Sequence, residues 1–96
     1  MGEARLVKLR YTPSALAELD EVFAYIEERS PQGAQHVKAR IQAVINLLLQ
    51  NPQAGQLTSK SQLRRVTVSP FPYHIFYQAA VDAIIIHAVR HASRKP

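Results

Sequence analysis

The first regular pattern of the chain is an alternation of apolar and cationic residues from Leu6 to Tyr11. The apolar positions are Val7, Leu9 and Tyr11, and the cationic positions between them are Lys8 and Arg10. A period of two is typical of a β-strand that buries one of its faces. The pattern therefore predicts a half-buried first strand.

Two helical patterns follow, and each starts with a capping residue and a proline, at Thr12-Pro13 and at Ser30-Pro31. Such pairs are typical of a helix N-cap and the first helical position. After each of these pairs, apolar residues recur every three or four positions. In the first helix they are Leu16, Leu19, Phe23 and Ile26, and in the second they are Ala34, Val37, Ile41, Val44 and Leu48. One apolar stripe on each helix, with a short break after Arg29, predicts an antiparallel helical hairpin.

The rest of the chain predicts three strands with short connections. Asn51-Pro52 and Gly55 end the second helix, and the polar run from Gln56 to Ser61 predicts a loop. The strands are expected at Leu63–Val68, Tyr73–Gln78 and Ala83–Val89, with a corner at Pro70-Phe71-Pro72 and a turn at Ala80-Val81-Asp82. The Ile84-Ile85-Ile86 run is apolar on both faces, so we place the last strand centrally in the sheet.

This order of strand, helix, helix and three-stranded meander predicts the fold class. We expect one α+β domain over residues 1–96, an antiparallel sheet with the helical hairpin packed on one face. Tyr73, Ile75 and Tyr77 share one face of their strand, so their side chains are expected in the core. His87 lies among isoleucines and is expected to be buried and hydrogen-bonded.

Composition narrows the classes of function. A chain of 96 residues with 47% hydrophobic positions is sized for one domain with a modest core. No stretch approaches about 20 apolar residues and no apolar run follows the first charges, so we expect a cytoplasmic protein without a membrane role. The absence of cysteine excludes disulfides and thiol nucleophiles. No spacing of His and acidic residues predicts a metal site, and no cofactor is expected.

Charge is unevenly distributed between the two halves of the chain. Residues 1–50 hold six Lys or Arg and six Asp or Glu, whereas residues 51–96 hold six Lys or Arg and only Asp82. The formal net charge of +5 therefore lies in the C-terminal half, together with three of the four histidines. Such asymmetry indicates a negatively charged partner.

Six short segments stand in a recognisable order along nearly the whole chain. They are Tyr11-Thr12-Pro13, Ser30-Pro31 with Ala34, Asn51-Pro52 with Gly55, Leu63-Arg64, Pro72-Tyr73-His74-Ile75-Phe76-Tyr77, and Val89-Arg90-His91 with Arg94. Together they resemble the ParE/RelE superfamily of bacterial toxins from type II toxin–antitoxin pairs. The resemblance is closer to the ParE-like branch, which includes plasmid stabilisation proteins, than to the RelE-like branch.

The resemblance implies a growth-arresting toxin, and we favour the ParE-like function of inhibiting DNA gyrase by direct binding. Such inhibition needs a docking surface and no acid–base pair, so on this hypothesis the protein is not an enzyme. The expected target-binding residues are Arg64, Arg65, Arg90, His91, Arg94 and Lys95. Arg64 and Arg65 point to opposite faces of a regular strand, so one should anchor to the protein while the other faces the partner.

The alternative function is that of a RelE-like endoribonuclease that cuts mRNA on the ribosome. Cleavage beside a 2′-hydroxyl needs a base, an acid and cations. The candidate catalytic residues are Arg65, His74, His91 and Arg94. The family pattern is incomplete, because Thr67 stands where a second basic residue is found and His74 where an arginine is found. A plain nucleic-acid binder is a third hypothesis, since aromatics on a basic sheet are typical of stacking platforms.

The resemblance also implies a partner protein, a cognate antitoxin with an unfolded tail. The tail would fold onto the toxin, with apolar side chains in a groove and acidic side chains on the basic patch. A toxin–antitoxin hetero-oligomer is therefore expected.

Overall fold

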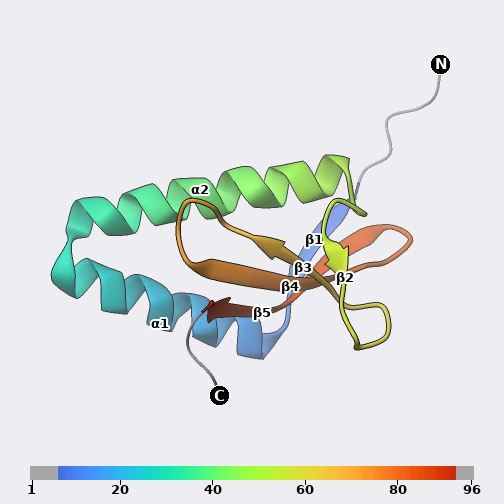
Figure 1. Cartoon of the computed structure of the whole chain (residues 1–96), viewed down its shortest axis with the longest axis horizontal. Coiled ribbons are helices and arrows are strands. Elements are labelled where there is room, and N and C mark those ends of the chain that lie inside the picture. Colours follow the sequence, from blue (N-terminus) through green and yellow to red (C-terminus); the bar gives the residue numbers. More distant parts are fainter. Residues whose placement is uncertain (1–6, 93–96) are drawn as a thin grey trace.

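A computed structural model describes residues 7–92, which contain two helices and five strands (Figure 1). In chain order these are β1 (Lys8–Tyr11), α1 (Pro13–Arg29), α2 (Pro31–Gln50), β2 (Gln56–Leu57), β3 (Arg64–Thr67), β4 (Tyr73–Ala79) and β5 (Ala83–His91). The two helices pack against an open sheet, which confirms the predicted α+β class. Within the described range, neither helix combines the length and apolarity that a membrane crossing requires.

The strand order across the sheet is β1-β5-β4-β3-β2. The β2–β3, β3–β4 and β4–β5 pairs are antiparallel, whereas β1 pairs with β5 in parallel. The predicted antiparallel sheet is confirmed from β2 to β5, whereas β1 joins it by a parallel pairing that was not predicted. Because β3–β4 and β4–β5 are both antiparallel, β3, β5 and β1 all run in the same direction. β5 lies between β1 and β4, so its predicted interior place in the sheet is confirmed.

The segment expected as a loop between Gln56 and Ser61 contains a second correction. Gln56 and Leu57 form the short strand β2, which pairs with Arg65 and Arg64 of β3. Two residues carry no alternation of their own, and the pairing follows from the position of β3 beside them. β2 is therefore one of the two edge strands of the sheet.

The helical hairpin starts and turns at the predicted capping residues. Thr12 Oγ1 accepts a hydrogen bond from the Ala15 N–H at 3.1 Å, and Ser30 Oγ accepts one from the Gly33 N–H at 2.9 Å. The Ser30 N–H also donates to the Ile26 carbonyl at 2.7 Å, so Ser30 ends α1 and begins α2. One residue therefore separates two antiparallel helices (Figure 1).

The hydrophobic core lies between this hairpin and one face of the sheet. It includes the helix residues Leu19, Val37, Ile41, Val44 and Leu48 and the strand residues Ile75, Ile84 and Ile86. Tyr73, Ile75 and Tyr77 are 7%, 0% and 0% exposed, which confirms that this face of β4 belongs to the core. The place of Leu16 in the apolar stripe of the first helix is wrong as a guide to burial. Leu16 is 50% exposed, and its neighbour Ala15 is fully buried in the core instead.

Candidate binding face of the sheet

The face of the sheet opposite the helices carries cations from three strands. We call it the open face and define it by the strand positions that share that side: Lys8 and Arg10 on β1, Gln56 on β2, Arg65 and Thr67 on β3, His74, Phe76 and Gln78 on β4, and Ile85, His87, Ala88 and Arg90 on β5. None of these positions, all within residues 7–92, is an Asp or a Glu. The strands therefore give this face positive charge and no acidic residue.

The strand register arranges the open face in rows that cross the sheet. The rows are Thr67, His74 and Arg90; Gln56, Arg65 and Phe76; and Gln78, Ile85 and Arg10. Neighbouring strands lie about 4.8 Å apart, so Arg65 and Arg90 are separated by two strand spacings and one row, with β4 and its His74 between their strands. One extended ligand can therefore contact all three side chains.

Arg65 and His74 lie on neighbouring strands of this face. Arg65 is exposed, and its Nη2 donates to Gln56 Oε1 at 3.3 Å. His74 Nδ1 lies 3.2 Å from Thr67 Oγ1. The His74 ring packs edge to face on the Phe76 ring, with 6.3 Å between the two ring centroids. Burial of the imidazole, and next the charge of Arg65, lower the pKa of His74 below its ordinary value of 6.5. His74 is thus a neutral hydrogen-bonding ring at neutral pH.

His87 is the extra residue of a β-bulge on β5. The pairing passes from Phe76 with Ala88 to Tyr77 with Ile86, so His87 has no partner position on β4. Its Nε2 lies 3.3 Å from Gln78 Oε1. The expected hydrogen bond is present, but the side chain is half-buried rather than buried because the bulge places it toward the open face.

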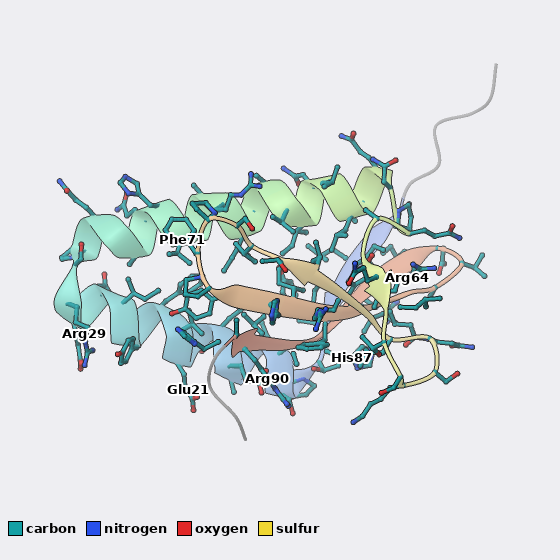
Figure 2. The ribbon with its side chains drawn as sticks, viewed as in Figure 1. Glu21, Arg29, Arg64, Phe71, His87 and Arg90 are labelled. Atoms are coloured by element: carbon teal, nitrogen blue, oxygen red, sulfur yellow. The ribbon has the colours of Figure 1, made fainter. Side chains whose placement is uncertain are left out.

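Arg64 points away from the open face. It pairs with Tyr77 of the core-facing side, and its Nη1 donates to the Gly55 carbonyl at 2.8 Å and to the Gln53 carbonyl at 3.3 Å. The structure therefore places one arginine of the pair as an anchor and Arg65 toward solvent, as the strand alternation predicts. Arg64 holds the loop before β2, and Figure 2 shows it beside that strand and the end of α2, apart from Arg90.

The end of β5 divides its residues between the two faces. Arg90 pairs with His74, and its Nε lies 3.5 Å from Glu18 Oε2 of α1. His91 pairs with Tyr73 and packs edge to face on its ring at 5.3 Å, on the side of the helices. Arg94 and Lys95, also predicted to bind the target, lie outside the described residues.

Comparison with known proteins identifies the family to which this chain belongs. The chain matches the family model described as "ParE toxin of type II toxin-antitoxin system, parDE" over residues 9–96. The chain belongs to the ParE toxin family. It is accordingly a ParE/RelE-like toxin of a type II toxin–antitoxin system.

Relatives support this membership along nearly their whole length. Y4kP of Sinorhizobium fredii is 34% identical over 88 residues, which cover 92% of this chain and 91% of that protein. Toxin RelE2 of Caulobacter vibrioides is 34% identical over 89 residues, which cover 93% and 99%. A solved chain of the chromosomal ParDE system from P. aeruginosa superposes with a TM-score of 0.80 at 20% identity, covering 94% and 100%. At that identity the likeness shows the shared fold.

In this ParE-family toxin, the four candidate catalytic residues do not form one cluster. Arg65 and His74 share the open face, whereas His91 lies on the opposite face beside Tyr73, and Arg94 lies outside the described residues. No group of three or more His, Asp or Glu side chains between residues 7 and 92 is arranged to hold a metal ion. The open face therefore carries cations and the neutral imidazole of His74.

Sequence reasoning missed the contribution of β1 to this face. Lys8 and Arg10 pair with Ala83 and Ile85 of β5, which places two cations of the N-terminal half on the same face of the sheet as Arg65 and Arg90. The alternation of β1 already showed that both share one side of the strand. Their place beside β5 depends on the parallel pairing, which the alternation alone does not specify.

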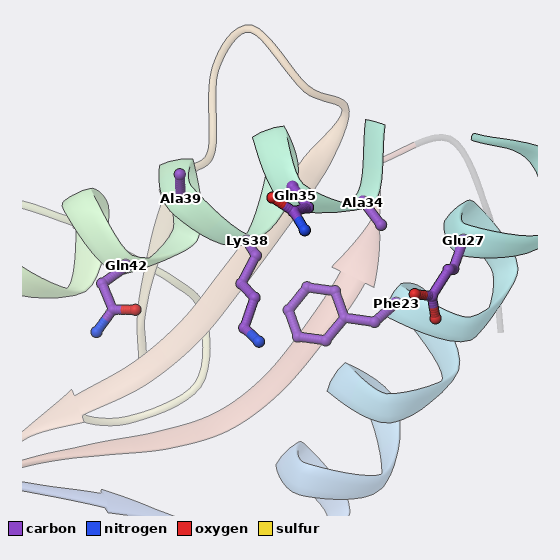
Figure 3. A pocket seen from close by; sticks show the side chains of 7 residues that line it. All are labelled: Phe23, Glu27, Ala34, Gln35, Lys38, Ala39 and Gln42. Atoms are coloured by element: carbon purple, nitrogen blue, oxygen red, sulfur yellow. The ribbon is translucent and has the colours of Figure 1, made fainter. Parts of the chain in front are cut away.

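A separate pocket lies between the two helices, away from the open face (Figure 3). Its volume is about 470 Å³, and its lining residues are Phe23, Glu27, Ala34, Gln35, Lys38, Ala39 and Gln42. Acidic, basic and apolar side chains are mixed in it, and none of the residues predicted for target binding or catalysis lines it. We therefore take the open face, and not this pocket, as the candidate functional site.

Proposed function

We propose that this ParE-family toxin inhibits DNA gyrase by direct binding through the open face, and that a cognate antitoxin neutralises it. The observation that supports this proposal is the gathering of Lys8, Arg10, Arg65 and Arg90 on one uncovered sheet face whose strand positions include no acid. Such a face attracts acidic protein patches or DNA phosphates. Gyrase would be met in the cytoplasm.

The antitoxin belongs to this proposal because the family is defined by toxin–antitoxin systems. An acidic segment of that partner would neutralise the open face, and the two proteins would form a hetero-oligomer. Arg64 is engaged with backbone carbonyls, so we assign it to shaping the loop before β2 and take Arg65 as the main target-binding arginine.

A second candidate function, cleavage of ribosome-bound mRNA, is favoured by one observation. His74 has a lowered pKa beside the Arg65 guanidinium, so a neutral imidazole that can accept a proton lies next to a cation that can hold a phosphate. The open face offers no second acid–base group beside them except the half-buried His87 of the bulge. Binding without chemistry accounts for the same residues with fewer requirements.

Induction of the toxin without antitoxin tests both functions in one culture. Plasmid supercoiling and gyrase-linked DNA breaks are measured beside mRNA cleavage at ribosomes. Breaks with intact mRNA support gyrase inhibition, whereas cut mRNA with normal supercoiling overturns it. Arg65→Gln should reduce the breaks strongly, and Lys60→Gln, which removes an equal charge from an exposed loop, is the matched control.

A further inference from the structure

The edge of β5 is completed by two residues that are not in a strand. β1 ends at Tyr11, and the next residue, Thr12, continues the hydrogen bonding to β5. The Thr12 N–H donates to the Ile86 carbonyl at 3.0 Å, and Thr12 Oγ1 donates to the His87 carbonyl at 3.3 Å. Further along, the Val89 N–H donates to Glu18 Oε1 of α1 at 2.9 Å. Glu18 therefore occupies the place of a strand partner at the end of β5.

This hydrogen bond fixes the position of the Glu18 carboxylate. Val89 is 3% exposed, and its N–H would lose its partner if the carboxylate turned away. The other oxygen, Oε2, lies 3.5 Å from Arg90 Nε, and the two side chains are 27% and 53% exposed. A negative charge is thus held beside the cation that ends one row of the open face.

Arg65 has a different electrostatic environment. Between residues 7 and 92, the ion pairs join Arg29 to Glu28 and Arg90 to Glu18, and Arg65 is in neither. The Arg65 guanidinium donates instead to the neutral amide of Gln56. An anionic group that approaches the open face therefore meets an unpaired charge at Arg65 and a partly neutralised one at Arg90.

We infer that Glu18 is a specificity-determining residue, a fixed counter-charge that weakens the binding of anionic groups at Arg90 and directs them toward Arg65. The inference rests on the proposed use of the open face for an anionic partner. An anion at Arg90 must compete with a carboxylate that the Val89 N–H holds in place, whereas an anion at Arg65 competes only with the neutral amide of Gln56.

The substitution Glu18→Gln separates charge from structure, because the amide oxygen can still accept from the Val89 N–H. Binding of a fluorescein-labelled heparin hexasaccharide, a polyanion, is measured by anisotropy at several salt concentrations. We expect Glu18→Gln to bind about two- to fivefold more tightly and with a steeper salt dependence. Asp20→Asn removes the same charge from an exposed position two residues along α1 and should have a smaller effect.

A double-mutant cycle with Arg90 gives the decisive comparison. In the wild type, Arg65→Gln should weaken heparin binding more than Arg90→Gln does. In the Glu18→Gln background, the loss caused by Arg90→Gln should grow toward that caused by Arg65→Gln. Equal losses from Arg90→Gln in both backgrounds, or a gain from Asp20→Asn as large as that from Glu18→Gln, would overturn the inference.

The same proteins distinguish failure of the inference from failure of the proposed function. If neither Arg65→Gln nor Arg90→Gln changes heparin binding or gyrase inhibition, the open face is not the binding surface and both ideas fail. If both variants weaken gyrase inhibition while Glu18→Gln changes neither affinity nor salt dependence, the inference alone is refuted.

Discussion

The hydroxyl of Tyr77 satisfies two backbone groups of the loop that follows α2. It accepts from the Gly55 N–H and donates to the Pro52 carbonyl, both at 2.8 Å, from a side chain that is 0% exposed. Gly55 is required there by space, because a Cβ atom on it would lie 2.7 Å from the Tyr77 hydroxyl and ring and 2.9 Å from the Arg65 carbonyl. The conformation of this loop therefore depends on the hydroxyl of Tyr77 and on the absence of a side chain at Gly55.

Tyr77→Phe is expected to lower the free energy of unfolding by about 1–3 kcal/mol, because it leaves the buried Gly55 N–H without its partner. Urea denaturation measures the change. Tyr25→Phe is the matched control, since Tyr25 is 44% exposed and phenylalanine keeps a ring beside Arg29. Equal stability of Tyr77→Phe and wild type would contradict the assigned hydrogen bonds.

His74 predicts a dependence of stability on pH. Its pKa is lowered in the folded protein, so below the ordinary value of 6.5 the unfolded chain binds the proton more readily. Its contribution to stability is complete above that pH and is lost as the pH falls through the lowered pKa. His74→Gln should therefore flatten the decline in unfolding free energy on acidification.

Thermal denaturation from about pH 7 to pH 5 measures this decline, with His36→Gln, an exposed position of α2, as the control. The pH profile of His36→Gln should resemble that of the wild type more closely than that of His74→Gln does. A His74→Gln profile as steep as the wild-type profile would show that other groups cause the decline.

At the scale of elements, local sequence signals predicted the helices correctly. They did not predict the strand pairings that depend on residues far away in the sequence. The Thr12 and Ser30 caps and the apolar stripes placed both helices, because a cap and its helix lie within a few residues of each other. β2 was missed because Gln56 and Leu57 are a strand only through β3. The parallel pairing of β1, and with it the place of Arg10, depends on β5 more than 70 residues away.

The two caps should differ in their contribution to stability. Thr12→Ala removes an N-cap bond and also the bond to the His87 carbonyl, which ties α1 to β5. Ser30→Ala removes an exposed N-cap bond. We expect losses of unfolding free energy of about 2 kcal/mol and about 1 kcal/mol, respectively, by urea denaturation. A larger loss at Ser30 would contradict the role of Thr12 as a link, and Ser61→Ala, in an exposed loop, is the control.

At the scale of the whole molecule, the open face concentrates positive charge on one side of a small domain. Cations on neighbouring strands repel one another, so an acidic partner should stabilise the folded state by removing that repulsion as well as by mass action. The proposed antitoxin is such a partner. The isolated toxin should therefore be less soluble and less heat-stable than the complex.

We expect the complex to melt at least about 10 °C above the isolated toxin, since saturation at about a thousandfold over Kd contributes about 4 kcal/mol. Differential scanning calorimetry of both samples at equal concentration measures the shift. Arg65→Gln toxin should show a smaller shift at low salt than Lys60→Gln toxin does. Equal melting temperatures with and without antitoxin would contradict a stabilising contact.

The parallel pairing of β1 with β5 also bears on when the toxin can fold during its synthesis. Among the described residues, β1 has its strand partner in residues 83–86 of β5, and α1 is tied to the same strand through Thr12 and Glu18. A ribosome must therefore polymerise the chain as far as Ile86 of β5 before the whole of β1 can join the sheet. Nascent chains that stop short of that point lack the paired β1, so translation itself delays the appearance of a harmful product.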